Sequence, residues 1–151
     1  MLELKIPPPL YLLIFGLLMS WLDYFFPEPQ WQGMYNLAVG GVFALLGLIC
    51  ILWAAGLFFR AKTTVSPLTP NNSTHLVTRG LYRFTRNPMY LGLFFMLIGW
   101  ALYLGSLASA LIVPAWVWAL NRWQIGPEEK ALEQRFGDDY RAYKNKVRRW
   151  L

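Results

Sequence analysis

Long apolar runs separated by polar segments restrict the fold of this sequence more than any other feature. The first two, residues 8–26 and 34–59, are about as long as the roughly 20 residues that a helix needs to cross a bilayer. The other two, residues 88–104 and 107–120, are shorter and flank the turn-forming pair Gly105-Ser106. A chain in lipid must satisfy its backbone hydrogen bonds internally, so these runs predict helices, with the last two paired as a hairpin.

Composition supports the bilayer as the solvent. Hydrophobic residues make up 56% of the chain and charged residues 15%, against about 25% charged in a typical soluble domain. We therefore expect an all-α, polytopic membrane protein with about four transmembrane helices, in a single domain of 151 residues. Residues 1–59 would hold two N-terminal spans, and residues 60–151 a polar loop, the hairpin and a C-terminal helix. Small residues suited to close helix packing line one face of the second span: Gly40, Gly41, Ala44 and Gly47.

Basic residues are distributed very unevenly along the chain. Of the 14 Lys and Arg, Lys5 alone precedes Arg60, and the loop at residues 27–33 has none. Because Lys and Arg accumulate in cytoplasmic segments beside membrane spans, we expect both termini in the cytoplasm and this loop outside it. The expected location is the inner (plasma) membrane of a prokaryote. Contact with anionic lipid explains the basic C-terminal part better than binding of nucleic acid.

The segment from Gly126 to Leu151 predicts an amphipathic helix on the cytoplasmic side. Pro127 suits the first position of a helix, and acidic residues follow it at the positive helix end. Gly137 is expected to weaken or bend this helix. Such a helix would lie on the membrane surface or against the polar loop. Its apolar side chains recur every three or four residues, which places them on one face: Leu132, Phe136, Tyr140, Tyr143 and Val147.

Four polar features fall on this same side of the membrane. Two are consecutive strips of the loop, residues 76–83 and 85–92, and two follow the hairpin, Asn121-Arg122 and Glu128-Glu129. Arg86-Asn87-Pro88 lies where the loop meets the third apolar run. A helix start of this kind binds anions through its free N–H groups, but an interfacial Arg followed by an Asn N-cap would give the same pattern. Both interpretations stay open.

Glu128 is the acid that most strongly indicates a site. It precedes Leu132 by four residues and therefore points along the apolar stripe, where a carboxylate needs a partner. Arg122 could be that partner or could bind an anionic ligand, and Glu128 could instead only complement the helix dipole. Glu129 is expected to be solvated, and His75, the only histidine, to be surface structure or a proton carrier. The sequence contains no zinc, catalytic-triad, Walker or GxGxxG motif.

In order and spacing, these segments resemble the isoprenylcysteine carboxyl methyltransferase family, which includes related phospholipid methyltransferases. The resemblance covers roughly residues 64–151. Its first motifs are Leu-Val-Thr-x-Gly-x-Tyr at residues 76–82 and Arg-Asn-Pro-x-Tyr-x-Gly at residues 86–92. After the hairpin come Glu128-Glu129 and Phe-Gly-x-x-Tyr-x-x-Tyr at residues 136–143.

The resemblance implies a methyltransferase that holds S-adenosylmethionine at the cytoplasmic membrane face. Arg122 and Glu128 would be its catalytic residues, with Arg122 toward the acceptor and Glu128 at the polar end of the cofactor. Asn87 stands where the eukaryotic members have His, and the usual His before the Leu-Val pair is here Thr74, with His75 shifted by one position. The implied cofactor-binding residues are Leu76, Val77, Tyr82, Asn87, Pro88, Met89, Tyr90, Glu128 and Glu129.

The acceptor is less constrained than the cofactor. A carboxylate or thiolate needs no strong base before methylation, whereas an ammonium must first lose a proton. The scarcity of bases therefore favours a lipophilic or small carboxylate or thiol, isoprenylcysteine-like, over an amine. Membrane lipid is the other expected partner, without metal. Two alternatives stay open: a lipid- or sterol-type reductase, distinguished by a nicotinamide cofactor, and a non-catalytic scaffold or small transporter subunit, which would bind no nucleotide-like cofactor.

Overall fold

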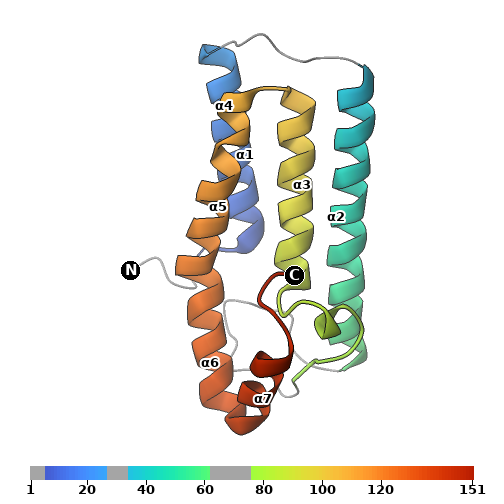
Figure 1. Ribbon diagram of the computed structural model, residues 1–151, viewed down its shortest axis with the longest axis vertical. Helices are drawn as coiled ribbons and strands as arrows, with labels where there is room; N and C mark the ends of the chain where they lie inside the picture. The colour runs from blue at the N-terminus through green and yellow to red at the C-terminus, as the bar shows by residue number, and fades with distance from the viewer. Residues whose placement is uncertain (1–5, 27–33, 62–75) are drawn as a thin grey trace.

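The computed structural model describes residues 6–26, 34–61 and 76–151, and the regular structure in these ranges is entirely helical. Helical columns stand side by side along the long axis of the molecule (Figure 1). The columns are α1 (Pro8–Phe25), α2 (Met34–Arg60), α3 (Pro88–Leu104) and one that begins with α4 (Leu107–Ala110) and α5 (Ile112–Leu120). The all-α prediction is therefore confirmed.

The first two columns have the length and composition of membrane spans, as predicted. Pro8–Phe25 and Tyr35–Arg60 are both long and apolar enough to cross a bilayer, whereas α3, with 17 residues, is shorter. Large apolar side chains are exposed along α1 and α2, among them Leu17 and Leu52. Such exposure is costly in water and favourable in lipid, so the surface agrees with a membrane setting.

The hairpin between the third and fourth apolar runs is present. Gly105 ends α3 in the left-handed conformation, with φ 65°, which glycine adopts without strain. Ser106 then caps α4, because its Oγ accepts a hydrogen bond from the N–H of Ser109. The second arm is interrupted at Leu111, between α4 and α5. The interruption lies where Pro114 has no N–H to donate to the preceding turn.

Two boundaries differ from the prediction. The helix of the fourth apolar run does not end at Asn121-Arg122. Its backbone continues through a π-helical turn, η3 (Asn121–Ile125), into α6 (Gly126–Phe136). Figure 1 shows α5 and α6 as one rod. The predicted C-terminal helix is in fact two, because Gly137 leaves the helical conformation with φ 53°, and α7 (Asp138–Lys146) folds back. The change to polar side chains after Leu120 ends the apolar surface but does not end the helix. The positive φ at Gly137 does end the helix.

Two pairs of glycines allow α2 and α3 to pack at backbone contact. A Cβ atom on Gly40 would lie 2.7 Å from the carbonyl oxygen of Gly99, and one on Gly92 would lie 2.6 Å from that of Gly47. Gly41 also belongs to the predicted small-residue face, but a Cβ atom there would meet nothing within 4 Å. The face is therefore used for close packing at Gly40 and Gly47, while Gly41 points into open space.

These contacts predict opposite effects for two neighbouring substitutions. Gly40→Ala should lower the melting temperature in detergent, because the new methyl group forces α2 away from α3 at a cost of about 1–3 kcal/mol. Gly41→Ala should leave it unchanged or raise it, since alanine favours a helix by about 1 kcal/mol and meets no neighbour here. Circular dichroism melts of both variants test the prediction, and equal melting temperatures would contradict it.

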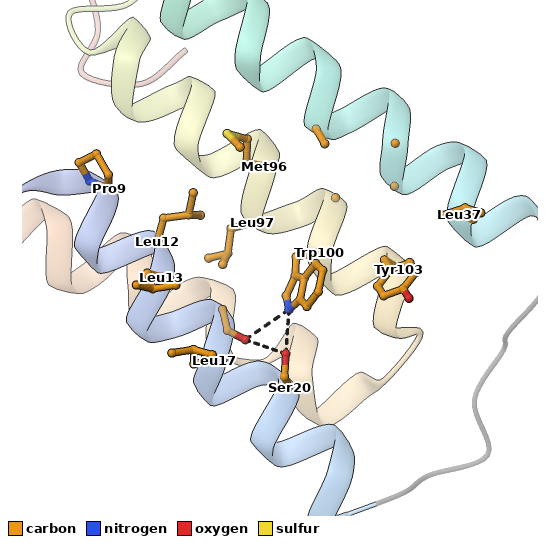
Figure 2. Close-up of a pocket in the computed structure, with 15 residues that line it drawn as sticks. Pro9, Leu12, Leu13, Leu17, Ser20, Leu37, Met96, Leu97, Trp100 and Tyr103 are labelled. Carbon is orange, nitrogen blue, oxygen red and sulfur yellow. Dashed lines mark hydrogen bonds between the residues drawn. The ribbon is translucent and has the colours of Figure 1, made fainter.

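An apolar groove separates α1 from α2 over the surface of α3 (Figure 2). It has a volume of about 780 Å³, and Leu13 and Leu37 lie on its opposite sides. Trp100 ties its floor to α1, because its indole Nε1 donates to the Ser20 hydroxyl at 3.1 Å and to the Gly16 carbonyl at 3.2 Å. On α3 the groove is formed by residues 96–103, so it lies more than a helical turn away from the first residues of this helix.

Candidate functional site

The polar features before and after the hairpin meet at one end of the bundle. The loop strips, residues 76–83 and 85–92, contain the 3₁₀ turn η2 (Gly80–Arg83) and enter α3 at Pro88, and Glu128-Glu129 lies at the start of α6. The Tyr90 hydroxyl on α3 donates a hydrogen bond of 2.7 Å to Oε2 of Glu128 on α6. The hairpin therefore brings together two side chains that are 38 residues apart in the sequence.

Glu128 lies in an environment that disfavours its charge. Burial raises the pKa of the Glu128 carboxyl to about 7, and the nearby negative charge of Glu129 raises it further, against the opposing effect of the Tyr90 hydrogen bond. A carboxyl with this pKa can gain or lose a proton near neutral pH. The predicted inward orientation of Glu128 agrees with this burial. Its hydrogen-bond partner is Tyr90, while the Arg122 side chain is exposed.

Glu129 is not solvated, and this prediction was wrong. It is only 5% exposed, and both of its carboxylate oxygens bind guanidinium groups. Arg86 Nη2 lies 2.9 Å from Oε1, and Arg149 Nη2 lies 2.6 Å from Oε2. Glu129 is buried because a chain segment remote in sequence returns across α6 and supplies Arg149. Its contacts tie the loop, α6 and the C-terminal residues together.

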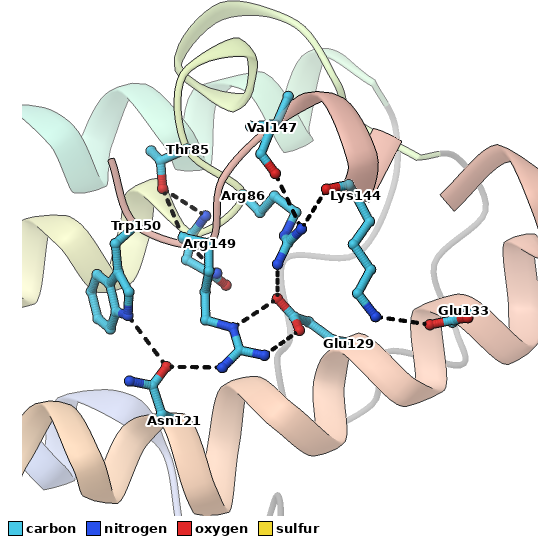
Figure 3. Close-up of polar contacts among 10 residues, drawn as sticks. Thr85, Arg86, Asn121, Glu129, Glu133, Lys144, Val147, Arg149 and Trp150 are labelled. Atoms are coloured by element: carbon cyan, nitrogen blue, oxygen red, sulfur yellow. Dashed lines mark hydrogen bonds and ion pairs between the residues drawn. The ribbon is translucent and has the colours of Figure 1, made fainter. Parts of the chain in front are cut away.

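The residues before α3 hold the C-terminal residues in place (Figure 3). Arg86 Nη1 donates to the carbonyls of Lys144 and Val147, at 2.9 and 3.1 Å. Asn87 is the N-cap residue of α3, but its side chain makes no capping hydrogen bond. Its Nδ2 donates instead to the Arg149 carbonyl at 2.9 Å. We call these contacts of Arg86 and Asn87 with residues 144–149 the clamp. Neither interpretation of Arg86-Asn87-Pro88 predicted it, because the partner residues come from the other end of the sequence.

The tyrosines of the predicted site are buried next to this clamp. The Tyr82 ring packs edge-to-face on Phe58 of α2, with ring centroids 5.4 Å apart. Its backbone carbonyl accepts a 2.7 Å hydrogen bond from the Tyr143 hydroxyl. Burial, followed by the charge of Glu128, holds the pKa of Tyr82 well above its usual value, so its hydroxyl stays neutral. Tyr82, Tyr90 and Glu128 therefore form one polar cluster.

The remaining predicted residues have varied surroundings. Pro88 is buried, and Leu76, Val77 and Met89 are partly buried. Thr74 and His75 lie outside the described residues. Asn121, which the sequence singled out together with Arg122, and Trp150, which it did not, also contact the C-terminal Arg149 or each other. Asn121 Oδ1 accepts from the indole Nε1 of Trp150 at 3.2 Å and from Arg149 Nη1 at 3.4 Å.

Gln124 is a residue of the site that was not predicted from the sequence. Its side chain is fully buried in η3, and neither its Oε1 nor its Nε2 has a hydrogen-bond partner. Its spacing could have predicted it, since Gln124 precedes Glu128 by four residues and so lies on the same helix face as Glu128. Nothing comparable in the sequence predicts that Asn121 or Trp150 closes the cluster.

The described residues form an apolar helical bundle, with two helices long enough to span a membrane, that carries a buried, partly titratable polar cluster at one end. The family described as phospholipid methyltransferase matches residues 35–139. Since this range covers most of the chain and includes the whole Tyr90–Glu128 region, the chain belongs to that family.

Individual relatives agree with the family match. The chain is 32% identical over 111 residues to a protein-S-isoprenylcysteine O-methyltransferase of Schizosaccharomyces pombe and 30% identical over 136 residues to that of Homo sapiens. These matches cover 68% and 86% of the chain, but 45% and 47% of the relatives, so the chain spans a little under half of their length. An uncharacterized protein of Haemophilus influenzae is 49% identical over 63 residues, which are 42% of this chain and all of that protein. No solved structure matches the chain.

Proposed function

We propose that the protein is an integral membrane methyltransferase that transfers the methyl group of S-adenosylmethionine to a lipophilic or small acceptor. The observation that carries this proposal is the Tyr90–Glu128 hydrogen bond, because it unites two family motifs into one polar cluster at the end of an apolar bundle. By the distribution of Lys and Arg, this end faces the cytoplasm. The expected setting is the inner membrane of a prokaryote.

The cluster fits the chemistry of this cofactor. S-adenosylmethionine carries a sulfonium, an α-ammonium and an α-carboxylate group, so its site needs an anionic acceptor and neutral donors. Glu128 supplies the anionic acceptor, and the neutral phenols of Tyr82 and Tyr90 supply the donors. The buried Gln124 amide, whose two polar atoms complete no hydrogen bond of good geometry, supports the proposal of a polar ligand here. When bound, the sulfonium supplies an already activated methyl group. The side chains of the cluster orient it, and the apolar shell of Leu76, Val77 and Met89 excludes water.

The acceptor is proposed to be a carboxylate or thiol on an isoprenylcysteine-like or other lipophilic molecule, in preference to an amine. Arg122 is exposed on η3, where the apolar column meets the polar end, and can meet an anionic acceptor there. The exposed apolar faces of the helices let such a molecule arrive through the bilayer.

Methyl transfer tests the proposal directly. The purified protein in lipid nanodiscs, given S-adenosylmethionine with a labelled methyl group, should transfer label to at least one of a panel of lipid, thiol and carboxylate acceptors. Calorimetry should show binding of S-adenosylhomocysteine, which carries everything but the methyl group. Absence of both signals in the folded protein would contradict the proposal, and binding of a nicotinamide dinucleotide in their place would indicate a reductase.

A further inference from the structure

The amide of Gln124 is a buried polar group that completes no hydrogen bond of good geometry within the described structure. Its side chain has no solvent exposure, and both Oε1 and Nε2 lack a hydrogen-bond partner. An unpaired buried amide destabilises a fold, and an apolar side chain of similar size would avoid this cost. A glutamine at this position is therefore poorly explained by packing.

The position of Gln124 links it to the cluster of Tyr90 and Glu128. It precedes Glu128 by four residues in one continuous helical column, so both side chains leave the same face. Its side chain approaches the Tyr90 hydroxyl as a potential hydrogen-bond partner, but the contact does not meet the distance and angle of a hydrogen bond. The local backbone is the π-helical turn η3, a distortion that occurs often at functional sites because it redirects side chains.

We propose that the Gln124 amide binds the amino-acid end of S-adenosylmethionine, next to Glu128. This inference rests on the proposed function and adds a ligand-contacting residue that the family motifs quoted above do not contain. The α-ammonium group requires an acceptor and the α-carboxylate a donor. Glu128 offers the anionic acceptor, while Nε2 of Gln124 offers the donor and Oε1 a second acceptor.

The adenine edge is another part of the ligand that could pair with an amide, because it also presents one hydrogen-bond donor and one acceptor. The charge of the surroundings favours the amino-acid end. Adenine brings no positive charge to Glu128, whereas the ammonium compensates a carboxylate that burial destabilises. Arg86 and Arg149 direct their guanidinium groups at Glu129, so the donor next to Glu128 is the neutral amide.

Trp116 provides a matched control on the same helical column. It is fully buried, and its indole Nε1 also lacks a hydrogen-bond partner. Its ring stacks on Phe94, with centroids 6.4 Å apart, in the apolar core. Trp116→Phe therefore removes an unpaired buried donor without touching the polar cluster.

The test measures two ligands on the full-length protein in nanodiscs. S-adenosylhomocysteine carries the amino-acid chain, whereas 5′-methylthioadenosine keeps the adenosine and the sulfur but lacks that chain. Gln124→Leu should weaken binding of the first about tenfold or more, as expected for a lost hydrogen bond to a charged group, and leave the second within about twofold. The melting temperature without ligand should stay the same or rise. Trp116→Phe should change neither affinity.

The results that would overturn the inference are distinct from failure of the proposed function. Wild-type affinity for S-adenosylhomocysteine in folded Gln124→Leu would overturn it, as would an equal loss for both ligands. Gln124→Met, which conserves volume better, guards against a shape effect of leucine. Loss of binding together with a lower melting temperature in both variants would make Gln124 structural. A wild-type protein that binds neither ligand would instead refute the proposed function.

Discussion

Replacing Glu129 by alanine is expected to lower the melting temperature more than any other single truncation on α6. The substitution leaves two guanidinium groups without their carboxylate, and the Arg86 side chain is only 9% exposed. Removing one partner of a buried ion pair costs about 3–5 kcal/mol, because the remaining charge stays desolvated. Arg149, at 38% exposed, can turn toward water, so most of the cost arises at Arg86.

Glu133→Ala is the control for this prediction. Glu133 also lies on α6 and also binds two basic side chains, Arg141 at 3.0 Å and Lys144 at 3.2 Å, but all three side chains are substantially exposed. Exposed pairs of this kind contribute about 0–1 kcal/mol. Melts in detergent should therefore separate the two variants clearly.

Loss of the Glu129 contacts should also release the C-terminal residues. Trypsin should then cleave after Arg148 or Arg149 faster in Glu129→Ala than in Glu133→Ala, and intact-mass measurement would detect the product. Equal melting temperatures and equal cleavage in the two variants would show that Glu129 does not hold the clamp.

The difference between these two acids shows how far the sequence could predict this structure. Hydropathy identified the apolar helices well, because burial in lipid depends on the average over a whole run rather than on any single contact. The turn at Gly105 was predictable for a similar reason, since glycine there satisfies a local backbone requirement. The end of the last column was not, because the helix continues for more than a dozen residues beyond the last apolar residue of the run, Leu120.

The site was predictable where it depended on helix phase and not where it depended on remote contacts. The four-residue step from Glu128 to Leu132 correctly turned Glu128 inward. Glu129 follows Glu128 by one residue and therefore leaves the inward face, so the sequence predicted that it is solvated. In the structure Arg149, 20 residues later, covers it. Family resemblance named Tyr90 but not its partner. The Tyr90–Glu128 hydrogen bond follows only from the register of the hairpin.

Ligand affinity should depend on pH through Glu128. With a pKa of about 7 in the folded protein, this carboxyl is mostly protonated at pH 6 and mostly ionised at pH 8. In the proposed binding mode, the ionised form is the one that attracts the α-ammonium group of the ligand. Affinity for S-adenosylhomocysteine should therefore rise about tenfold from pH 6 to pH 8 and then level off. Isothermal calorimetry at several pH values measures this dependence.

Glu128→Gln should bind more weakly at pH 8 and lose this pH dependence, because the amide does not titrate. Glu133→Gln serves as the control. It removes a carboxyl from the same helix, and since Arg141 and Lys144 lower the Glu133 pKa, that group is ionised throughout this range. Its affinity profile should follow the wild type. A flat wild-type profile between pH 6 and pH 8 would show that the Glu128 charge does not act on the ligand.

The same carboxyl should make the protein less stable as pH rises. Its pKa is about 7 when folded and near its ordinary value of 4.5 when unfolded, so between these values the folded state binds the extra proton. The contribution of Glu128 to stability is therefore greatest below about pH 4.5, falls as the pH rises to about 7, and is lower by about 3 kcal/mol above it. Glu128→Gln should remove this loss and melt at a higher temperature than the wild type at pH 8, with the difference shrinking toward pH 5. A variant that is more stable but binds its ligand more weakly is the signature of a residue kept for function rather than for folding. A Glu128→Gln protein that melts below the wild type at pH 8 would contradict this assignment.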